Sequence, residues 1–303
     1  MKYLSLIGLV LAGSVLAGEG AVELDREDVV VHGTLLKPDA AETLVILHAG
    51  SGPTDRDGNQ TGMINNSLRL LAEAIADQGI AVLRYDKRGI GASRSDQPES
   101  DLRPSHYVND LVAWVEWGRD RGFEHIHLIG HSEGALFAKA AAHEVPVDSV
   151  ISIAGAGRSA GVLLREQTEG RLPGELGEQF EEILTALEAG RQADEVPTVL
   201  QSIFRSSVQP YMIEWLAMEP AELAAGLDVP LLVIGGSTDL QVGQADFDAL
   251  AAHARDSAWI EGMNHVLKPA EGPIEEQITI YNNPDLPLHE ALTPTLAEWL
   301  DSQ

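Results

Sequence analysis

The chain has 303 residues, of which 44% are hydrophobic, so it is long enough to bury one large core together with an insertion. Its 47 acidic residues outnumber its 20 basic residues and give a formal net charge of −27, which disfavours binding to nucleic acids and to anionic lipid surfaces. It contains no cysteine, which excludes disulfides and attachment of lipid to a cysteine. The acidity fits two explanations, adaptation to salt water and an ordinary soluble surface.

The first 17 residues are typical of a secretory signal peptide. Lys2 supplies a positive charge, residues 4–12 are apolar, and Val15-Leu16-Ala17 places small residues where signal peptidase cleaves. The apolar run is shorter than the roughly 20 residues that a membrane-spanning helix needs. We therefore predict cleavage after Ala17 and export of the remaining chain to the periplasm or the medium, without a membrane span.

Helical and strand-like patterns alternate along most of the chain. Residues 23–36 first indicate an antiparallel pair of strands. Helical patterns then precede apolar strand patterns three times, at 67–78 and 80–85, at 104–120 and 125–129, and at 132–143 and 149–153. Such alternation predicts an α/β fold with a mostly parallel sheet flanked by helices. A long, mostly helical stretch at 157–227 interrupts it, so we predict a core at 18–156 and 228–303 that carries an inserted helical cap.

An early apolar strand pattern at 44–48 opens into a glycine-rich loop at 49–59. Glycine allows a backbone to approach a ligand closely, so this loop can bring its N–H groups near a ligand oxygen. Gly50 is the first candidate for such a donor, and Ser51 is the alternative.

The same loop contains Asp55, Asp57 and Asn59 at alternate positions, as calcium-binding loops do. A calcium loop of the EF-hand type would have glycine at its sixth position and glutamate at its twelfth. This chain has Gln60 and Asn66 there. We therefore predict no metal site in this loop or elsewhere in the chain.

The most informative motif is Gly130-His131-Ser132-Glu133-Gly134, which has the form G-x-S-x-G. It follows an apolar strand pattern and precedes a helical one, and a serine on such a sharp turn is forced outward as a nucleophile. The helix that follows aims its first N–H groups at a developing oxyanion. We therefore predict Ser132 as the nucleophile, and the N–H groups of Glu133 and of Gly50 or Ser51 as the oxyanion hole.

A serine nucleophile needs a histidine base and an acid that orients it, here in the chain order Ser, Asp, His. Asp239 follows an apolar strand pattern at 230–236, and His265 follows another at 258–261. Both therefore fall at the carboxyl edge of the predicted sheet, where such folds place their chemistry. Alternative acids, Asp246 and Asp248, fall in the next helix, and an alternative base, His289, lies close to the last one.

With these motifs, the chain resembles the α/β-hydrolase superfamily over nearly its whole predicted mature length. It is similar in particular to bacterial esterases related to the serine aminopeptidase and proline iminopeptidase branch. The matching segments are 50–59, 85–93, 238–242 and 262–265. The resemblance implies Ser132, Asp239 and His265 as the catalytic triad. The chain departs from the family pattern at His48-Ala49, where His-Gly is usual.

The cap offers apolar and aromatic candidates for substrate binding. The segment from Phe204 to Tyr211 resembles a cap segment of this branch, and Trp215 follows it in the same helical stretch. We therefore predict that Phe204, Tyr211 and Trp215 contact the substrate, although most apolar cap residues are expected to pack the cap onto the core.

Together these features predict a serine hydrolase that cleaves small-molecule carboxylic esters through an acyl-enzyme and needs no cofactor. One alternative is an aminopeptidase with the same triad, in which cap carboxylates such as Glu178, Glu181 and Glu182 would hold the substrate ammonium. The least favoured alternative is a ligand-binding protein without catalysis, because binding alone does not need a complete triad. The sequence carries no prediction of an oligomeric state.

Overall fold

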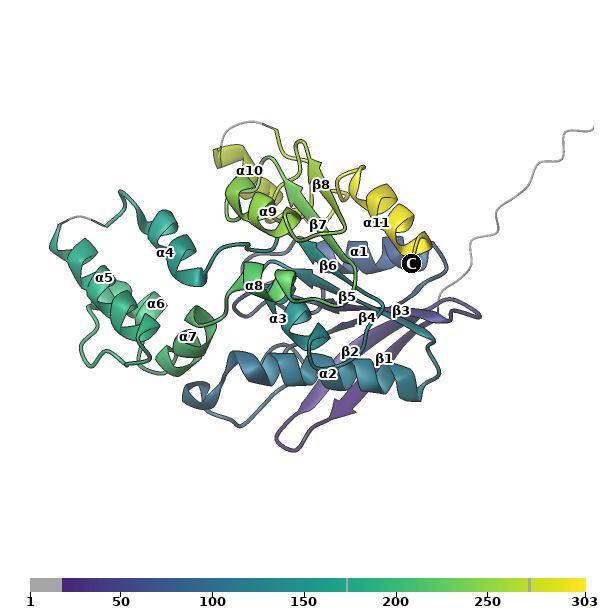
Figure 1. The fold of residues 1–303 in the computed structure, drawn as a ribbon, viewed down its shortest axis with the longest axis horizontal. Helices are drawn as coiled ribbons and strands as arrows, with labels where there is room; N and C mark the ends of the chain where they lie inside the picture. Colours follow the sequence, from purple (N-terminus) through teal and green to yellow (C-terminus); the bar gives the residue numbers. More distant parts are fainter. Residues whose placement is uncertain (1–17, 173, 272–273) are drawn as a thin grey trace, which may run out of the picture.

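The computed structural model describes residues 18–172, 174–271 and 274–303 (Figure 1). The predicted signal peptide at 1–17 lies outside these residues. Within them, eight strands form one sheet: β1 (Gly18–Asp25), β2 (Val30–Lys37), β3 (Thr43–His48), β4 (Ala81–Tyr85), β5 (His125–His131), β6 (Ser149–Ile153), β7 (Leu231–Gly236) and β8 (Asp256–Ile260).

The strand order across the sheet is β1-β2-β4-β3-β5-β6-β7-β8. The pairs β1–β2 and β2–β4 are antiparallel, and all other pairs are parallel. The predicted antiparallel start and parallel continuation are therefore both confirmed. Because parallel strands point the same way, the residues that follow β3, β5, β7 and β8 meet at one edge of the sheet.

Helices cover both faces of the sheet (Figure 1). One face packs against α2 (Pro104–Asp120), α3 (Glu133–Ala142), α8 (Pro220–Ala225) and α9 (Gln244–Ala251). The other packs against α1 (Ser67–Ala76) and α11 (Leu292–Asp301). The remaining core helices are η1 (Glu99–Asp101) and α10 (Ile274–Ile280). The two-residue period of a strand divides β3 between these faces: Leu44 and Ile46 join the first cluster, and Val45 and Leu47 the second.

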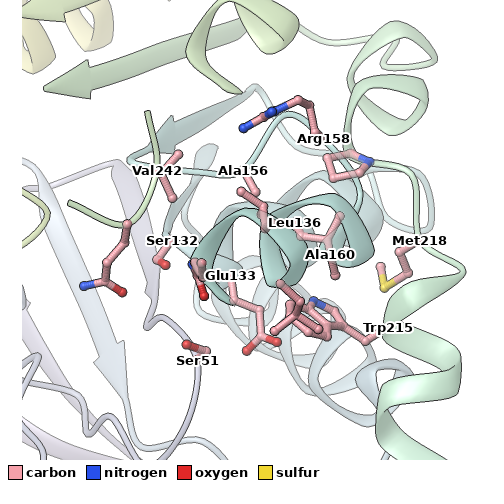
Figure 2. A pocket seen from close by; sticks show the side chains of 15 residues that line it. Ser51, Ser132, Glu133, Leu136, Ala156, Arg158, Ala160, Trp215, Met218 and Val242 are labelled. Carbon is pink, nitrogen blue, oxygen red and sulfur yellow. The ribbon is translucent and has the colours of Figure 1, made fainter. Parts of the chain in front are cut away.

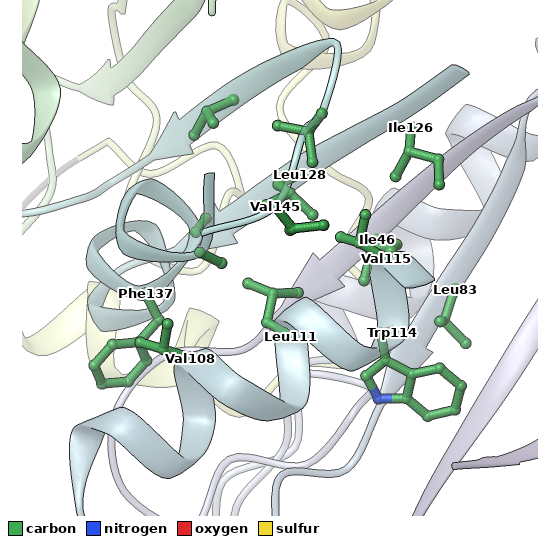
Figure 3. Packing of buried hydrophobic residues seen from close by; sticks show 14 of the residues in the cluster. Ile46, Leu83, Val108, Leu111, Trp114, Val115, Ile126, Leu128, Phe137 and Val145 are labelled. Carbon is green, nitrogen blue, oxygen red and sulfur yellow. The ribbon is translucent and has the colours of Figure 1, made fainter. Parts of the chain in front are cut away.

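The helix α2 shows why the sheet is so deeply buried. Its residue Val115 lies beside Ile46 of β3, and its residue Val108 lies beside Phe137 of α3 (Figure 3). Trp114 of the same helix is fully buried and contacts Tyr85 with ring centroids 5.6 Å apart. Burial of such large side chains contributes on the order of 2 kcal/mol each, which makes this side of the core a rigid support for the strand ends.

Between β6 and β7 the chain leaves the sheet and builds a cap (Figure 1). Its helices are α4 (Ala160–Thr168), α5 (Glu175–Glu188), η2 (Thr198–Leu200), α6 (Gln201–Phe204) and α7 (Gln209–Leu216). They share a small apolar core of their own, centred on Phe180, Leu184 and Phe204. The next helix, α8, instead packs against α3 of the core. The chain has therefore rejoined the core before residue 228.

Among the described residues, two ion pairs join the cap to the core. At its base, Arg158 donates to the buried carboxylate of Asp246 on α9, with Nη2 to Oδ2 at 2.7 Å. At its outer side, Arg205 pairs with Glu99 of η1, which also accepts a hydrogen bond from Ser207. None of the described helices is long and apolar enough to cross a membrane.

Candidate active site

Ser132 occupies the sharp turn between β5 and α3. Its backbone has φ 55° and ψ −124°, a left-handed conformation that a non-glycine residue adopts only where the surroundings enforce it. A Cβ atom at Gly130 would lie 2.2 Å from the carbonyl oxygen of Gly134, and one at Gly134 would lie 2.4 Å from that of His48. Both flanking glycines are therefore required by close backbone contact, as the G-x-S-x-G motif predicts.

Asp239 and His265 are brought together from the ends of β7 and β8. Nδ1 of His265 lies 2.8 Å from Oδ2 of Asp239, and the two side chains are 6% and 1% exposed. The other carboxylate oxygen accepts backbone N–H groups from Gln241 and Val242, at 2.7 and 3.0 Å. Desolvation alone would raise the pKa of Asp239, but His265 and these two N–H groups together lower it. The carboxylate therefore stays ionised and holds the imidazole.

Ser132, His265 and Gly50 line one small cavity of about 50 Å³. The three residues come from the loops that follow β5, β8 and β3, so the structure places the predicted nucleophile, base and oxyanion loop around one space. The alternatives considered for the acid and the base lie elsewhere. Asp246 is bound to Arg158, Asp248 is exposed on α9, and His289 packs in the turn before α11.

His131 packs against the catalytic histidine and contacts its backbone. Its Nε2 lies 2.8 Å from the backbone carbonyl oxygen of His265, and the two ring centroids are 4.9 Å apart. Burial, followed by the charge of His265, lowers the pKa of His131 to about 4. The ring is therefore neutral at ordinary pH, so it donates its N–H to that carbonyl and adds no second positive charge beside His265.

The loop that follows β3 presses against the nucleophile. A Cβ atom at Gly50 would lie 3.0 Å from Cβ of Ser132, so only glycine fits there without a shift. The buried ammonium of Lys87, which follows β4, donates to the carbonyl oxygens of Gly50 and Gly52. A carbonyl and the next N–H point in opposite directions in a trans peptide. Lys87 therefore fixes the N–H of Ser51 on the side of the peptide that faces away from the ammonium.

Two larger cavities meet at this site, and Ser51, Glu133 and Trp215 border both. The smaller, of about 250 Å³, contains Ser132 and has mostly apolar walls from the cap and the core (Figure 2). The larger, of about 510 Å³, extends beneath α6 and α7 of the cap and contains Tyr107 and Tyr211. Together they provide room for the two halves of a small ester on either side of the nucleophile.

The structure divides the predicted substrate contacts. Tyr211 and Trp215 line the larger cavity, and Trp215 lines the smaller one as well. Phe204 is fully buried in the cap and packs on Phe180 with ring centroids 5.2 Å apart, so it contacts neither cavity. Its side chain faces the inside of the cap because the short helix α6 turns its apolar side toward α5.

The acidic cap residues offered as ammonium ligands also lie outside the site. Glu178, Glu181 and Glu182 are exposed on α5, and Glu181 pairs with Arg165 at 3.0 Å. The carboxylates that border the larger cavity are Glu99 and Glu133. The sequence predicts only a backbone role for Glu133, whereas in the structure its side chain also borders both large cavities.

Neither Lys87 nor His131 was assigned a role from the sequence. Lys87 was visible only as part of the 85–93 segment that resembles the superfamily, and His131 only as a variable position of the elbow motif. Asp55, one of the alternating carboxylates, accepts N–H groups from Asp57 and Asn59 with a single oxygen. Within 18–172, 174–271 and 274–303 no group of three or more potential ligands is arranged to hold a metal ion.

Parts of this chain resemble known hydrolases in sequence. A family model described as serine aminopeptidase, S33, matches residues 62–180. Esterase EstD of Thermotoga maritima is 26% identical over 265 residues, which cover 83% of this chain and 63% of that protein. This chain therefore spans less than two thirds of the length of that relative.

Solved structures share the fold at low identity. Est1E of Butyrivibrio proteoclasticus, with ferulic acid bound, superposes with a TM-score of 0.63 at 18% identity and covers 93% of this chain and 99% of its own. The Pyrococcus furiosus esterase Pf2001 gives a TM-score of 0.59 at 18% identity, with 98% and 95% covered.

Proposed function

We propose that this chain, which has the fold and the motifs of an α/β hydrolase, is a serine hydrolase that cleaves carboxylic esters of small molecules. The observation that carries the proposal is the convergence of Ser132, the His265–Asp239 pair and the Gly50 loop on one cavity. The esterase name of the relative from Thermotoga maritima supports the same reaction class.

In the proposed reaction, Ser132 attacks the ester carbonyl carbon while His265 takes its proton. The tetrahedral oxyanion is held by the N–H of Glu133 at the start of α3 and by an N–H of the Gly50–Ser51 loop. His265, oriented by Asp239, then gives the proton to the departing alkoxide and leaves an acyl group on Ser132. A water molecule, deprotonated by His265, releases the acyl group along the same path.

Aminopeptidase activity is the second candidate, because the family model that matches residues 62–180 carries that description. An aminopeptidase must also bind a free substrate ammonium. The cap residues first considered for this task, Glu178, Glu181 and Glu182, are exposed and border neither large cavity. An alkoxide departs more readily than an amine, so a triad with an oxyanion hole suffices for esters, and this reaction is favoured.

A substrate panel on the purified protein distinguishes the two reactions. Short-chain p-nitrophenyl esters and matched aminoacyl p-nitroanilides are compared by kcat/KM, with Ser132→Ala as the control for contaminating hydrolases. We expect the esters to be cleaved efficiently, the anilides poorly, and the variant to lose activity about 10³- to 10⁶-fold. Faster cleavage of the anilides would favour the aminopeptidase, and no Ser132-dependent hydrolysis would overturn the proposal.

We also propose that the protein is exported after cleavage of residues 1–17. The support is the sequence pattern of Lys2, the apolar run and the small residues that end at Ala17. Expression of the full chain in a Gram-negative host, fractionation and intact-mass analysis test it. A periplasmic product that begins at Gly18 is expected, whereas an uncleaved cytoplasmic product would contradict the proposal.

A further inference from the structure

The larger cavity combines apolar walls with a small set of charged groups. Its walls include Pro53, Ile90, Leu102, Ile203, Val208 and Met212. Four charged side chains also border it, and these are Lys87, Glu99, Glu133 and Arg205. An apolar pocket with few polar groups selects its ligand through those groups, so their existing partners decide what they can still bind.

Three of the four charged groups already have charged or carbonyl partners. Lys87 donates to two carbonyl oxygens of the loop that follows β3. Arg205 and Glu99 pair with each other through both guanidinium nitrogens that face the carboxylate. These groups shape the cavity, and their partners already use much of their hydrogen-bonding capacity.

Glu133 differs because only one hydrogen bond to its carboxylate comes from the described residues. The hydroxyl of Tyr211 donates to Oε1 at 2.9 Å. A carboxylate offers about four acceptor positions, so several remain. The side chain projects from the start of α3 into the space between Ser51 and Trp215, directly beside Ser132 (Figure 2). A ligand that fills the cavity must therefore either donate to this carboxylate or leave its remaining acceptor positions buried without a donor.

The local charge indicates what kind of donor fits. The ammonium of Lys87 borders the same cavity and interacts electrostatically with Glu133, so the carboxylate is already partly compensated. A substrate ammonium would gain the attraction of Glu133 but would meet the repulsion of Lys87. A neutral hydroxyl gains the hydrogen bond without that repulsion, and the apolar walls accept the hydrocarbon that carries it.

We propose that Glu133, with Tyr211, forms a subsite for a neutral hydroxyl group on an otherwise apolar substrate. This inference rests on the proposed ester hydrolysis and specifies its substrate class as esters of hydroxylated, uncharged compounds. An unsubstituted chain in the same place would bury the acceptor positions that Tyr211 leaves free, and such unpaired positions discriminate strongly between similar substrates.

Matched esters test the subsite. In the first series, methyl esters of unsubstituted, ω-hydroxy and ω-amino fatty acids of equal chain length are compared. In the second series, the hydroxyl group is carried by the alcohol portion of the ester instead of the acyl portion. In the parent protein we expect the hydroxylated ester to exceed the unsubstituted one by about 10- to 100-fold in kcat/KM at the length that reaches Glu133. The ω-amino ester should show no comparable preference.

Variants test whether Glu133 causes the preference for the hydroxylated ester. Glu133→Leu should bring the hydroxyl preference close to one, and Glu133→Gln, which keeps an acceptor oxygen, should retain part of it. Glu99→Gln is the matched control, because it alters a carboxylate of the same cavity that is already paired. The ratio is the readout, so a general change in turnover does not mimic the result.

Several outcomes would overturn the inference while leaving ester hydrolysis intact. They are a ratio near one in the parent at every length in both series, an undiminished ratio in Glu133→Leu, and a Glu133-dependent preference for the amino ester. The ratio of kcat/KM values in the parent protein tests the inference even if Glu133→Leu does not fold. Absence of any Ser132-dependent ester hydrolysis would instead overturn the proposed function, and the subsite with it.

Discussion

The core and the cap face the same cavities, but different interactions hold them in place. In the core, the side chains of Asp239 and His265 are 1% and 6% exposed, and Asp239 is further bound by two backbone N–H groups. In the cap, the outer link between Arg205 and Glu99 joins side chains that are 43% and 42% exposed. Exposed pairs of this kind contribute only about 0–1 kcal/mol.

This difference indicates a division of roles between the two regions. The catalytic groups are fixed by packing and by short strand-end loops, as catalysis requires, because a small displacement of reacting groups costs much of the rate. The ion pair between the outer edge of the cap and η1 therefore contributes little to the free energy that holds these two segments together. Its base is held more firmly by Arg158 and Asp246. We therefore expect changes in the core to alter kcat, and changes at the cap edge to alter mainly KM.

The largest expected effect is in the core. Asp239→Asn removes the charge that orients His265 and stabilises its protonated form, so kcat should fall by about 10³- to 10⁴-fold with the fold intact. The matched control is Asp248→Asn, which changes an exposed side chain of α9 and should leave kcat unchanged. Near-normal turnover of Asp239→Asn would show that another residue orients the base.

The sequence predicted the core site and the cap to different degrees for a physical reason. Ser132, Asp239 and His265 each follow a strand pattern, and parallel strands necessarily bring their carboxyl ends to one edge. The direction in which a cap helix turns its side chains depends on tertiary packing instead. Tyr211 and Phe204 were equally plausible substrate contacts from their pattern, yet Tyr211 lines the cavity and Phe204 fills the inside of the cap.

Other site residues could not be predicted from the sequence, because no local pattern indicates which distant residues they contact. Lys87 follows a strand like many surface lysines, and only the approach of the loop after β3 explains why it is buried. Asp246 was weighed as a triad acid, but the fold pairs it with Arg158, which is 88 residues away in the sequence. Such long-range pairing becomes visible only in the folded chain.

The base of the cap provides the second prediction. Asp246 accepts hydrogen bonds from the backbone N–H groups of Gly157 and Arg158 as well as from the guanidinium. Asp246→Ala leaves these donors without a partner in a buried place and should lower the free energy of unfolding by about 3 kcal/mol. Urea denaturation measures it. Glu166→Ala removes the exposed partner of Arg158 and should cost less than about 1 kcal/mol; equal effects of the two variants would contradict a buried anchor.

The third prediction concerns the stability of the core in acid. Burial lowers the pKa of His127 and of His131 to about 4, against a value of 6.5 for a free histidine. The unfolded chain therefore binds more protons between pH 6.5 and 4, so stability is full above 6.5 and is lost as the pH falls toward 4. At pH 5 each histidine should cost roughly 2 kcal/mol.

Urea unfolding of the parent and of His127→Gln at pH 7 and pH 5 tests this sign. His127 contacts Ser149 within the sheet and does not border the catalytic cavities, so it isolates the effect of burial from that of catalysis. The variant should lose less stability than the parent between the two pH values. An equal loss in both proteins would show that His127 is already protonated in the folded state or that it titrates normally.

The smallest expected effect is at the outer edge of the cap. Arg205→Ala breaks an exposed pair, so KM for a short ester should change by no more than about fivefold while kcat is preserved. High salt should reproduce part of the change in the parent, because it screens the same pair. A large fall in kcat would show that the cap edge supports the catalytic groups, and would remove the contrast between the two regions.

The most direct test of the central claim is covalent labelling of the nucleophile. The purified protein is treated with a fluorophosphonate, and the modified peptide is located by mass spectrometry. We predict a single phosphonylated site at Ser132, no labelling of Ser132→Ala, and much slower labelling of His265→Ala, because the serine then lacks its base. Labelling at another serine, or labelling that survives in Ser132→Ala, would contradict the account.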